Sequence, residues 1–335
     1  MRAAVLHAFG QPLRMEELAD PEPAAGEVIV EVRAVGLCAT DLKITSGAFA
    51  DTPLPIVPGH EIAGLVAATG TDVADLGPGQ RVACHVYDAC GACSRCRAGQ
   101  ETLCPFSKRI GVDLDGGLAR YVRMKARNVF PFPDSVPFES AAIAMDAVLS
   151  TWRALQVRAG LKEGERLVIA GAGGLGLNAI QVARALGATV AVLDPAADHR
   201  RAATAAGAEL AVGPDEWRQV LEWSHGGADV GLEASGRREG FDAALNSLRP
   251  GARLVCNGYW PGVEYGLDSK ALVLDEITLL GSRNGSRADA RAALEAVGKG
   301  QVTPLVMEHL PLDEVNRGLE LLRTGAVLGR IVVHP

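Results

Sequence analysis

The pattern of apolar and polar positions changes near residue 150. Before that point, short runs of apolar residues are interrupted at close intervals by Pro and Gly, and few segments show a helical period. Residues 28–35 and 62–68 are typical of strands. We therefore predict that the first part of the chain is rich in β-structure and irregular loops.

After that point, apolar runs alternate with segments of helical period. The runs predict strands at residues 166–170, 189–193, 209–212, 230–234, 253–256 and 277–280. Helices are expected between them, at residues 175–186, 196–206 and 241–248. This alternation predicts an α/β unit with a parallel sheet and helices on both faces. Towards the C-terminus we expect helices at 288–297 and 312–323 and a strand at 330–334.

Composition and charge exclude several classes of protein. The chain has 335 residues, which favours two domains, and 48% hydrophobic residues exclude wholesale disorder. The net charge is −7, and no run of Lys or Arg exceeds two residues, so we expect neither a nucleic-acid nor a membrane partner. There is no apolar stretch of about 18 residues and no secretory signal, so we expect a cytoplasmic location.

A glycine-rich turn lies between the predicted strand 166–170 and the following helix. Its G-x-G-x-x-G pattern in this context is typical of dinucleotide-binding turns, in which backbone and a helix N-terminus approach a pyrophosphate. The expected cofactor-binding residues of this turn are Gly171, Gly173, Gly174, Leu175 and Gly176. The alternative is a purely structural turn.

Asp194 ends the next predicted strand, 18 positions after Gly176. A carboxylate at this place can bind the ribose hydroxyls and repels a 2′-phosphate, which favours NAD over NADP. The basic residues His199, Arg200 and Arg201 weaken this argument, and Asp194 could instead be a solvated surface residue.

Four of the seven cysteines form a C-x₂-C-x₂-C-x₇-C cluster. Four thiolates at this spacing can enclose one tetrahedral ion with no position left for water, which is typical of a structural zinc. An iron–sulfur cluster and four unliganded thiols are the alternatives. The members are Cys90, Cys93, Cys96 and Cys104, in a lobe expected over about residues 88–106.

A second set of ligand-type residues is spread along the chain. Taken singly, each has an ordinary interpretation: a core cysteine, a hydrogen-bonded histidine or a helix cap. The set comprises Cys38, His60, Glu61 and Asp146.

Together these motifs resemble the zinc-dependent medium-chain dehydrogenases, which include alcohol and polyol dehydrogenases. Residues 59–64 read Gly-His-Glu-Ile-Ala-Gly, and Gly70 completes the zinc signature of that family. The four-cysteine lobe, the glycine-rich turn and the C-terminal residues 328–333 fit as well, so the resemblance covers essentially the whole chain.

The resemblance implies a GroES-like catalytic domain over residues 1–147 and 284–335 and a Rossmann domain over 148–283. It implies two Zn²⁺ ions per chain, NAD as cofactor, alcohol or carbonyl substrates, and a homo-oligomer, a tetramer or a dimer. Hydride then passes between an alcohol and nicotinamide, giving an aldehyde or a ketone.

It also assigns roles to single residues. Cys38, His60 and Asp146 become ligands of a catalytic zinc, with Glu61 as neighbour or exchanging ligand, and Asp146 stands where the alcohol dehydrogenase pattern has a second Cys. Thr40 supplies the hydroxyl that receives the alcohol proton, and Asp41 orients the ligand histidine. Lys43 replaces a proton-relay His of several relatives and is either part of the relay or a solvated lysine. Arg330 corresponds to a basic residue near the cofactor pyrophosphate.

Two rival classes remain. A zinc-free quinone or enoyl reductase would share the two-domain plan but lack Cys38, His60 and the cysteine lobe. A non-catalytic zinc-binding module would explain the lobe but not the glycine-rich turn with Asp194. The sequence does not identify the substrate, because pocket walls come from loops whose shape is not readable from it.

Overall fold

The chain divides into two compact units in the computed structural model, which describes residues 1–325 and 327–335. The first unit comprises Met1–Asp146, Gly285–Gly300 and Val306–Pro335, and the second comprises Ala147–Asn284 and Gln301–Leu305. The domain bounds that the resemblance implies, 1–147 with 284–335 and 148–283, stay a prediction.

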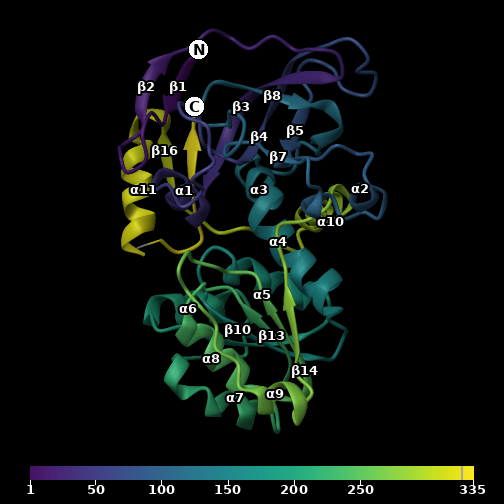
Figure 1. The fold of residues 1–335 in the computed structure, drawn as a ribbon, viewed down its shortest axis with the longest axis vertical. Coiled ribbons are helices and arrows are strands. Elements are labelled where there is room, and N and C mark those ends of the chain that lie inside the picture. Colours follow the sequence, from purple (N-terminus) through teal and green to yellow (C-terminus); the bar gives the residue numbers. More distant parts are fainter. Residues whose placement is uncertain (326) are drawn as a thin grey trace. The chain divides into compact units, whose positions relative to one another are not determined.

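The first unit is built on a seven-stranded sheet with the path β16-β17-β3-β4-β5-β9, in which β8 also pairs with β3 (Figure 1). Val, Ile and Leu side chains on these strands form a continuous buried core. The strands of this unit are β1 (Arg2–Val5), β2 (Arg14–Glu17), β3 (Glu27–Leu37), β4 (Glu61–Thr69), β5 (Arg81–Cys84), β6 (Tyr87–Asp88), β7 (Lys108–Arg109), β8 (Tyr121–Lys125), β9 (Val129–Pro131), β16 (Val306–Pro311) and β17 (Arg330–His334).

Short helices accompany this sheet. They are α1 (Ala39–Thr45), α2 (Ser94–Arg97), α3 (Phe138–Ile143), α10 (Arg287–Gly298) and α11 (Val315–Thr324), with 3₁₀ turns η1 (Glu101–Leu103), η2 (Ala126–Asn128) and η6 (Leu312–Glu314).

The second unit contains a six-stranded sheet whose neighbouring strands are all parallel, in the order β12-β11-β10-β13-β14-β15. The order reverses at β10, which is typical of doubly wound folds that bind ligands at this switch point. The strands are β10 (Arg166–Ala170), β11 (Thr189–Leu193), β12 (Leu210–Val212), β13 (Ala228–Glu233), β14 (Leu248–Cys256) and β15 (Thr278–Gly281). The predicted parallel α/β sheet is therefore confirmed.

Helices connect these strands (Figure 1). They are α5 (Gly176–Ala185), α6 (Ala197–Ala205), α7 (Arg218–Trp223), α8 (Arg238–Asn246) and α9 (Ser269–Val273), with the 3₁₀ turn η5 (Pro214–Glu216). Because parallel crossovers are right-handed, the reversal of strand order places α5 and α8 on opposite faces of the sheet. The helix predicted over residues 241–248 ends earlier in the structure. Its counterpart α8 ends at Asn246, and Leu248 already pairs with Ala228 as the first residue of β14.

Sequence reasoning missed a long helical run that follows α3. It continues through the π-helical η3 (Ala144–Val148), α4 (Leu149–Trp152) and the π-helical η4 (Arg153–Ala159). Most side chains from residue 141 to 155 are buried, so the segment lacks the amphipathic period that reveals a surface helix. Every helix in the described part of the chain is too short or too polar to span a bilayer.

Candidate functional site

Cys38 is held at the N-terminus of α1, directly after β3. Its Sγ accepts a hydrogen bond from the Thr40 backbone N–H at 3.3 Å, and its own backbone N–H donates to Asp41 Oδ2 at 2.8 Å. This reciprocal capping box fixes the thiol on the first turn of the helix.

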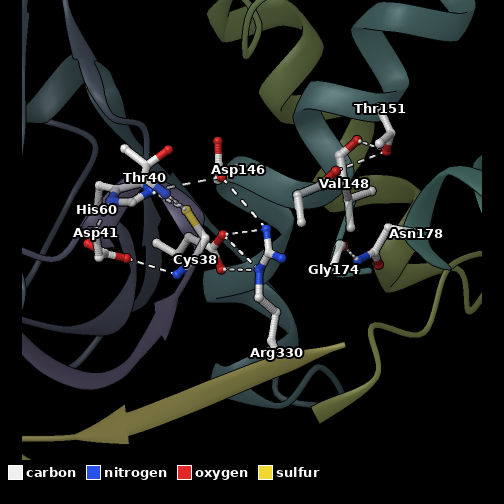
Figure 2. Close-up of polar contacts among 12 residues, drawn as sticks. Cys38, Thr40, Asp41, His60, Asp146, Val148, Thr151, Gly174, Asn178 and Arg330 are labelled. Carbon is white, nitrogen blue, oxygen red and sulfur yellow. Dashed lines mark hydrogen bonds and ion pairs between the residues drawn. The ribbon is translucent and has the colours of Figure 1, made fainter. Parts of the chain in front are cut away.

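His60 lies between Cys38 and Asp41, with its side chain almost completely buried (Figure 2). Its Nε2 is 3.1 Å from Cys38 Sγ, and its Nδ1 is 3.3 Å from Asp41 Oδ1. Both Nδ1 and Oδ1 are buried without another hydrogen-bond partner among the described residues. If Nε2 binds a metal, Nδ1 carries the ring proton and faces Asp41, which is the arrangement that metal-bound histidines usually adopt.

Glu61 begins β4 beside His60 and is completely buried. The guanidinium of Arg330 on β17 approaches it, with Nε 3.0 Å from Oε1. A Cβ at Gly36 would lie 2.1 Å from Glu61 Oε2, so only glycine leaves room for this carboxylate. Sequence reasoning missed Gly36, although a glycine inside a strand often marks such a close approach.

Asp146 lies in the π-helical η3, so its interpretation as a helix cap is wrong. Its Oδ2 is 3.9 Å from His60 Nε2 and 3.8 Å from Arg330 Nη2 (Figure 2). Ligand atoms from Cys38, His60, Glu61 and Asp146 all lie within 4.8 Å of one another. π-helical turns often occur at functional sites, because the extra residue redirects a side chain.

The charges of this cluster favour a cation at its centre. Burial lowers the pKa of His60, but the negative charges of Cys38 and Asp41 outweigh it and raise the pKa well above its usual range. Burial raises the pKa of Glu61 to about 7, although Arg330 opposes that rise. A thiolate, an imidazole and carboxylates are ligands that zinc accepts, so the donor set fits this metal.

Two further residues near Cys38 were predicted to move a proton. Thr40 is half-buried, and Lys43 is only 5% exposed, so its interpretation as a solvated surface lysine is wrong. Burial lowers the pKa of Lys43, and the charges of Cys38 and Asp146 partly oppose this effect.

The four-cysteine lobe brings its thiols together on one side of the first unit. The separations between neighbouring sulfurs run from 3.5 Å for Cys93 and Cys96 to 3.9 Å for Cys90 and Cys96. Zinc–sulfur bonds in a tetrahedron place sulfurs about 3.8 Å apart. All four cysteines are free of disulfides, so the lobe fits a closed structural zinc.

The glycine-rich turn follows β10 in the second unit. Gly171 has a φ of +94°, which favours glycine, and a Cβ at Gly176 would lie 1.8 Å from Gly171 O. A Cβ at Gly173 would meet nothing within 4 Å, so open space lies beside this backbone. Asn178 Nδ2 donates to Gly174 O at 2.8 Å and stiffens the turn (Figure 2). The turn therefore fits the pyrophosphate of a dinucleotide.

Asp194 follows β11 and binds the same turn, because its Oδ2 accepts from the Ala172 N–H at 2.7 Å. It also accepts from Ala196 N at 2.9 Å, and His199 Nδ1 lies 3.3 Å away. Burial opposes ionisation of Asp194, but the hydrogen bonds from His199 and the two amides outweigh it and lower its pKa. A carboxylate has about four acceptor positions, so one remains for a ligand.

His199 is the partner of Asp194, a role that sequence reasoning missed. Its two neighbours have other partners than the Asp194 carboxylate: Arg200 Nη1 donates to the backbone oxygen of Asp194 at 2.8 Å, and Arg201 pairs with Asp198. The basic residues that weakened the argument for NAD therefore have partners within α6 and its N-terminal turn.

Arg330 was predicted to lie near the cofactor pyrophosphate. In the first unit it is buried against Glu61 and Asp146, beside the metal-ligand cluster. Its contact with a cofactor stays a prediction.

Comparison with known families gives two matches. Residues 24–134 match the alcohol dehydrogenase GroES-like domain, and residues 174–299 match the zinc-binding dehydrogenase family. These ranges contain the glycine-rich turn from Gly174 onwards, His60, Glu61 and the cysteine lobe.

Individual relatives align along the whole chain. An alcohol dehydrogenase of Moraxella sp. (strain TAE123) is 38% identical over 337 residues, covering 99% of each chain. The crystal structure of the alcohol dehydrogenase from the archaeon Aeropyrum pernix has a TM-score of 0.93 and 31% identity and covers 100% of both chains. An acryloyl-coenzyme A reductase of Metallosphaera sedula is 30% identical over 335 residues, covering 99% of each.

Proposed function

The chain belongs to the zinc-containing medium-chain alcohol dehydrogenase family, and we propose that it transfers a hydride between an alcohol and NAD, giving an aldehyde or a ketone. The observation that carries this proposal is the cluster of Cys38, His60, Glu61 and Asp146 in the first unit, in which Asp146 is partly exposed and the other three are buried. A structural lobe alone would not need this second set of ligands.

Cys38, His60 and Asp146 would hold the catalytic zinc. When bound, the ion acts as a Lewis acid and lowers the pKa of an alcohol that reaches it. Asp41 fixes the ring proton of His60 on Nδ1 and so directs the Nε2 lone pair at the ligand cluster. Arg330 holds Glu61 by an ion pair and keeps its carboxylate beside the cluster.

Thr40 and Lys43 are the residues that move the proton in this proposal. The Thr40 hydroxyl stands on the first turn of α1, two residues after Cys38, and receives the proton of the alcohol. Lys43 lies one turn further along the same helix, and its lowered pKa suits a group that passes a proton onward.

NAD rather than NADP is the proposed cofactor, bound by the turn Gly171–Gly176 and by Asp194. The remaining acceptor position of Asp194 suits a ribose hydroxyl, whereas its negative charge repels a 2′-phosphate. The Asp194 carboxylate also accepts a hydrogen bond from Ala172, in the turn that would bind the pyrophosphate. The same contact would therefore hold the ribose site and the pyrophosphate site in a fixed relation to each other.

The test is a panel of primary, secondary, aromatic and polyol alcohols, offered with NAD or NADP to the zinc-loaded protein. We expect reduced nicotinamide to form with one alcohol class, and a chelator or the Cys38→Ser variant to abolish it. Absence of turnover in the whole panel, with zinc bound, would contradict the proposal.

A second candidate function is reduction of an enoyl thioester, favoured by the similarity to an acryloyl-coenzyme A reductase. It predicts oxidation of NADH or NADPH by acryloyl-coenzyme A in the same assay. Turnover of this thioester without turnover of any alcohol would select this function.

We also propose that the chain forms a homo-oligomer, a tetramer or a dimer. β15 is the last strand of the six-stranded sheet and exposes Leu279, and such an apolar edge favours pairing with another chain. Light scattering on the eluting peak of a sizing column gives the mass. A monomer across the accessible concentration range would contradict this proposal.

A further inference from the structure

We propose that His309, His334 and Glu139 form a third metal site, which takes a divalent transition-metal ion such as Zn²⁺. The site lies on the first unit, shares no residue with the two clusters described above, and does not depend on the proposed dehydrogenase activity.

Three separate segments bring these side chains together. His309 is on β16, the last strand of the seven-stranded sheet, and His334 is on the neighbouring parallel strand β17. Glu139 is on α3, which contacts β3 and β4 of the same sheet. One ligand atom from each residue lies within 4.8 Å of the other two. The backbone therefore presents two nitrogens and a carboxylate at one point, although the residues are distant in the sequence.

The orientation of His334 is fixed by the backbone. Its Nδ1 lies 2.9 Å from the carbonyl oxygen of Arg33. Because a carbonyl oxygen only accepts, Nδ1 carries the ring proton and Nε2 keeps its lone pair. A backbone carbonyl that holds the far nitrogen of a histidine is a usual feature of metal sites.

That lone pair faces the other two residues. His334 Nε2 is 3.1 Å from His309 Nδ1 and 3.9 Å from Glu139 Oε1. The planes of the two rings are nearly parallel, with an angle of 11° between them. Without a metal, His309 Nδ1–H donates to His334 Nε2. The same separation of 3.1 Å joins Cys38 Sγ and His60 Nε2 in the catalytic cluster.

A bound ion would take the place of the Nδ1 proton of His309, between this nitrogen and His334 Nε2. Two imidazole nitrogens on a tetrahedral zinc are about 3.3 Å apart, so the pair needs to open only by a few tenths of an ångström. His309 is exposed, so its ring is free to turn until both lone pairs converge, while its proton moves to the other ring nitrogen. Two neutral imidazoles and one carboxylate suit Zn²⁺ and leave its fourth position to water.

A bound ion would join β16 to β17 and α3. Both strands carry buried residues of the core, such as Leu310 and Val333. The ion would therefore stabilise the folded state, by an amount that rises with the logarithm of the free Zn²⁺ concentration once this exceeds the Kd.

The experiment is equilibrium dialysis of the protein, loaded with two zinc ions per chain, against increasing free Zn²⁺, with metal content as readout. We expect a third equivalent in the wild type, weakened by at least about 10-fold in His309→Asn and in His334→Asn. His309 is exposed, so His309→Asn should keep the thermal midpoint in the absence of added zinc and the alcohol turnover.

The matched control is His7→Asn. His7 Nε2 lies 2.6 Å from Glu16 Oε1, so it is a surface histidine paired with a carboxylate but lacking the second histidine. This variant should bind the third equivalent like the wild type, and added zinc should raise its thermal midpoint equally. The proposal is overturned if the wild type takes up no third equivalent, or if His309→Asn retains it with unchanged affinity.

Discussion

The guanidinium of Arg330 lies against the carboxylate of Glu61, with Nη2 and Nε each 3.0 Å from Oε1, and both side chains are buried. One comes from β17 and the other from β4, so the pair links two strands that β3 separates. Such a pair restrains the carboxylate beside the metal ligands.

Removing one partner of this ion pair should destabilise the protein. Arg330→Met leaves Glu61 buried without its countercharge, which typically costs about 3–5 kcal/mol of the free energy of unfolding. The double variant Glu61→Gln with Arg330→Met should recover part of this loss. Thermal or urea unfolding measures both.

The control for this prediction is Arg317→Met. Arg317 Nη2 pairs with Glu308 Oε1 at the same 3.0 Å, but its side chain is 52% exposed. Exposed pairs contribute at most about 1 kcal/mol, so this variant should be nearly neutral. Equal losses in the two arginine variants would show that burial of the Arg330 pair is unimportant.

Asp194→Gly should narrow the preference for NAD over NADP. The variant removes the charge that repels a 2′-phosphate and the acceptor for a ribose hydroxyl, so kcat/KM for NAD falls relative to that for NADP. It should also lower stability by about 1–3 kcal/mol, because the buried Ala172 N–H loses its acceptor.

The readouts are the ratio of kcat/KM values for the two cofactors and the unfolding curve. Asp198→Asn is the control, since Asp198 pairs with Arg201 on the exposed side of α6. An unchanged cofactor ratio in Asp194→Gly would exclude Asp194 from ribose recognition.

Substitutions in the two zinc clusters should have different effects, one on turnover and the other on stability. Cys38→Ser should abolish turnover and keep the fold, because the catalytic cluster sits on a sheet with its own core. Cys93→Ser should lower the thermal midpoint, because a structural ion contributes folding free energy to a lobe that has little core. Each variant should hold one zinc fewer than the wild type by metal analysis. A stable, fully active Cys93→Ser would argue against the structural role.

The contribution of His199 to stability should depend on pH. Its hydrogen bond to Asp194 raises the pKa of His199 in the folded state. The contribution is therefore complete below the ordinary histidine pKa of about 6.5 and is lost as pH rises through the raised folded value.

The lowered pKa of Asp194 works in the opposite direction. Its contribution is present above the ordinary aspartate pKa of about 3.9 and is lost only as pH falls through the lowered value. His199→Ala should thus be less stable than the wild type at about pH 6, with the difference fading in alkaline solution. Urea unfolding at a series of pH values measures it, and a difference that grows with pH would refute the ion pair.

Much of the second unit was predictable from the sequence, because its strands alternate regularly with helices and its glycine-rich turn lies directly between a strand and a helix. β10 and β11 have the bounds expected from their apolar runs. The run from α3 to η4 was not predictable, since burial on all sides removes the periodic signal that a surface helix shows.

The ligand types were readable from the sequence, but their assembly was not. The spacing of Cys90, Cys93 and Cys96 is short enough for the local chain alone to place their sulfurs around one ion. Cys38, His60 and Asp146 are separated by long stretches, so the sequence identified them only through a family resemblance.

Only the tertiary structure decided which distant side chains meet. The partnership of Arg330 with Glu61, the room that Gly36 leaves for that carboxylate, and the bond from Ala172 to Asp194 depend on strand pairing. The sequence by itself determined most strands and helices of the second unit, the four ligands of the cysteine lobe and the cofactor turn, because these follow from local periodicity and spacing. Contacts across a sheet depend on register and strand order, which are properties of the folded chain.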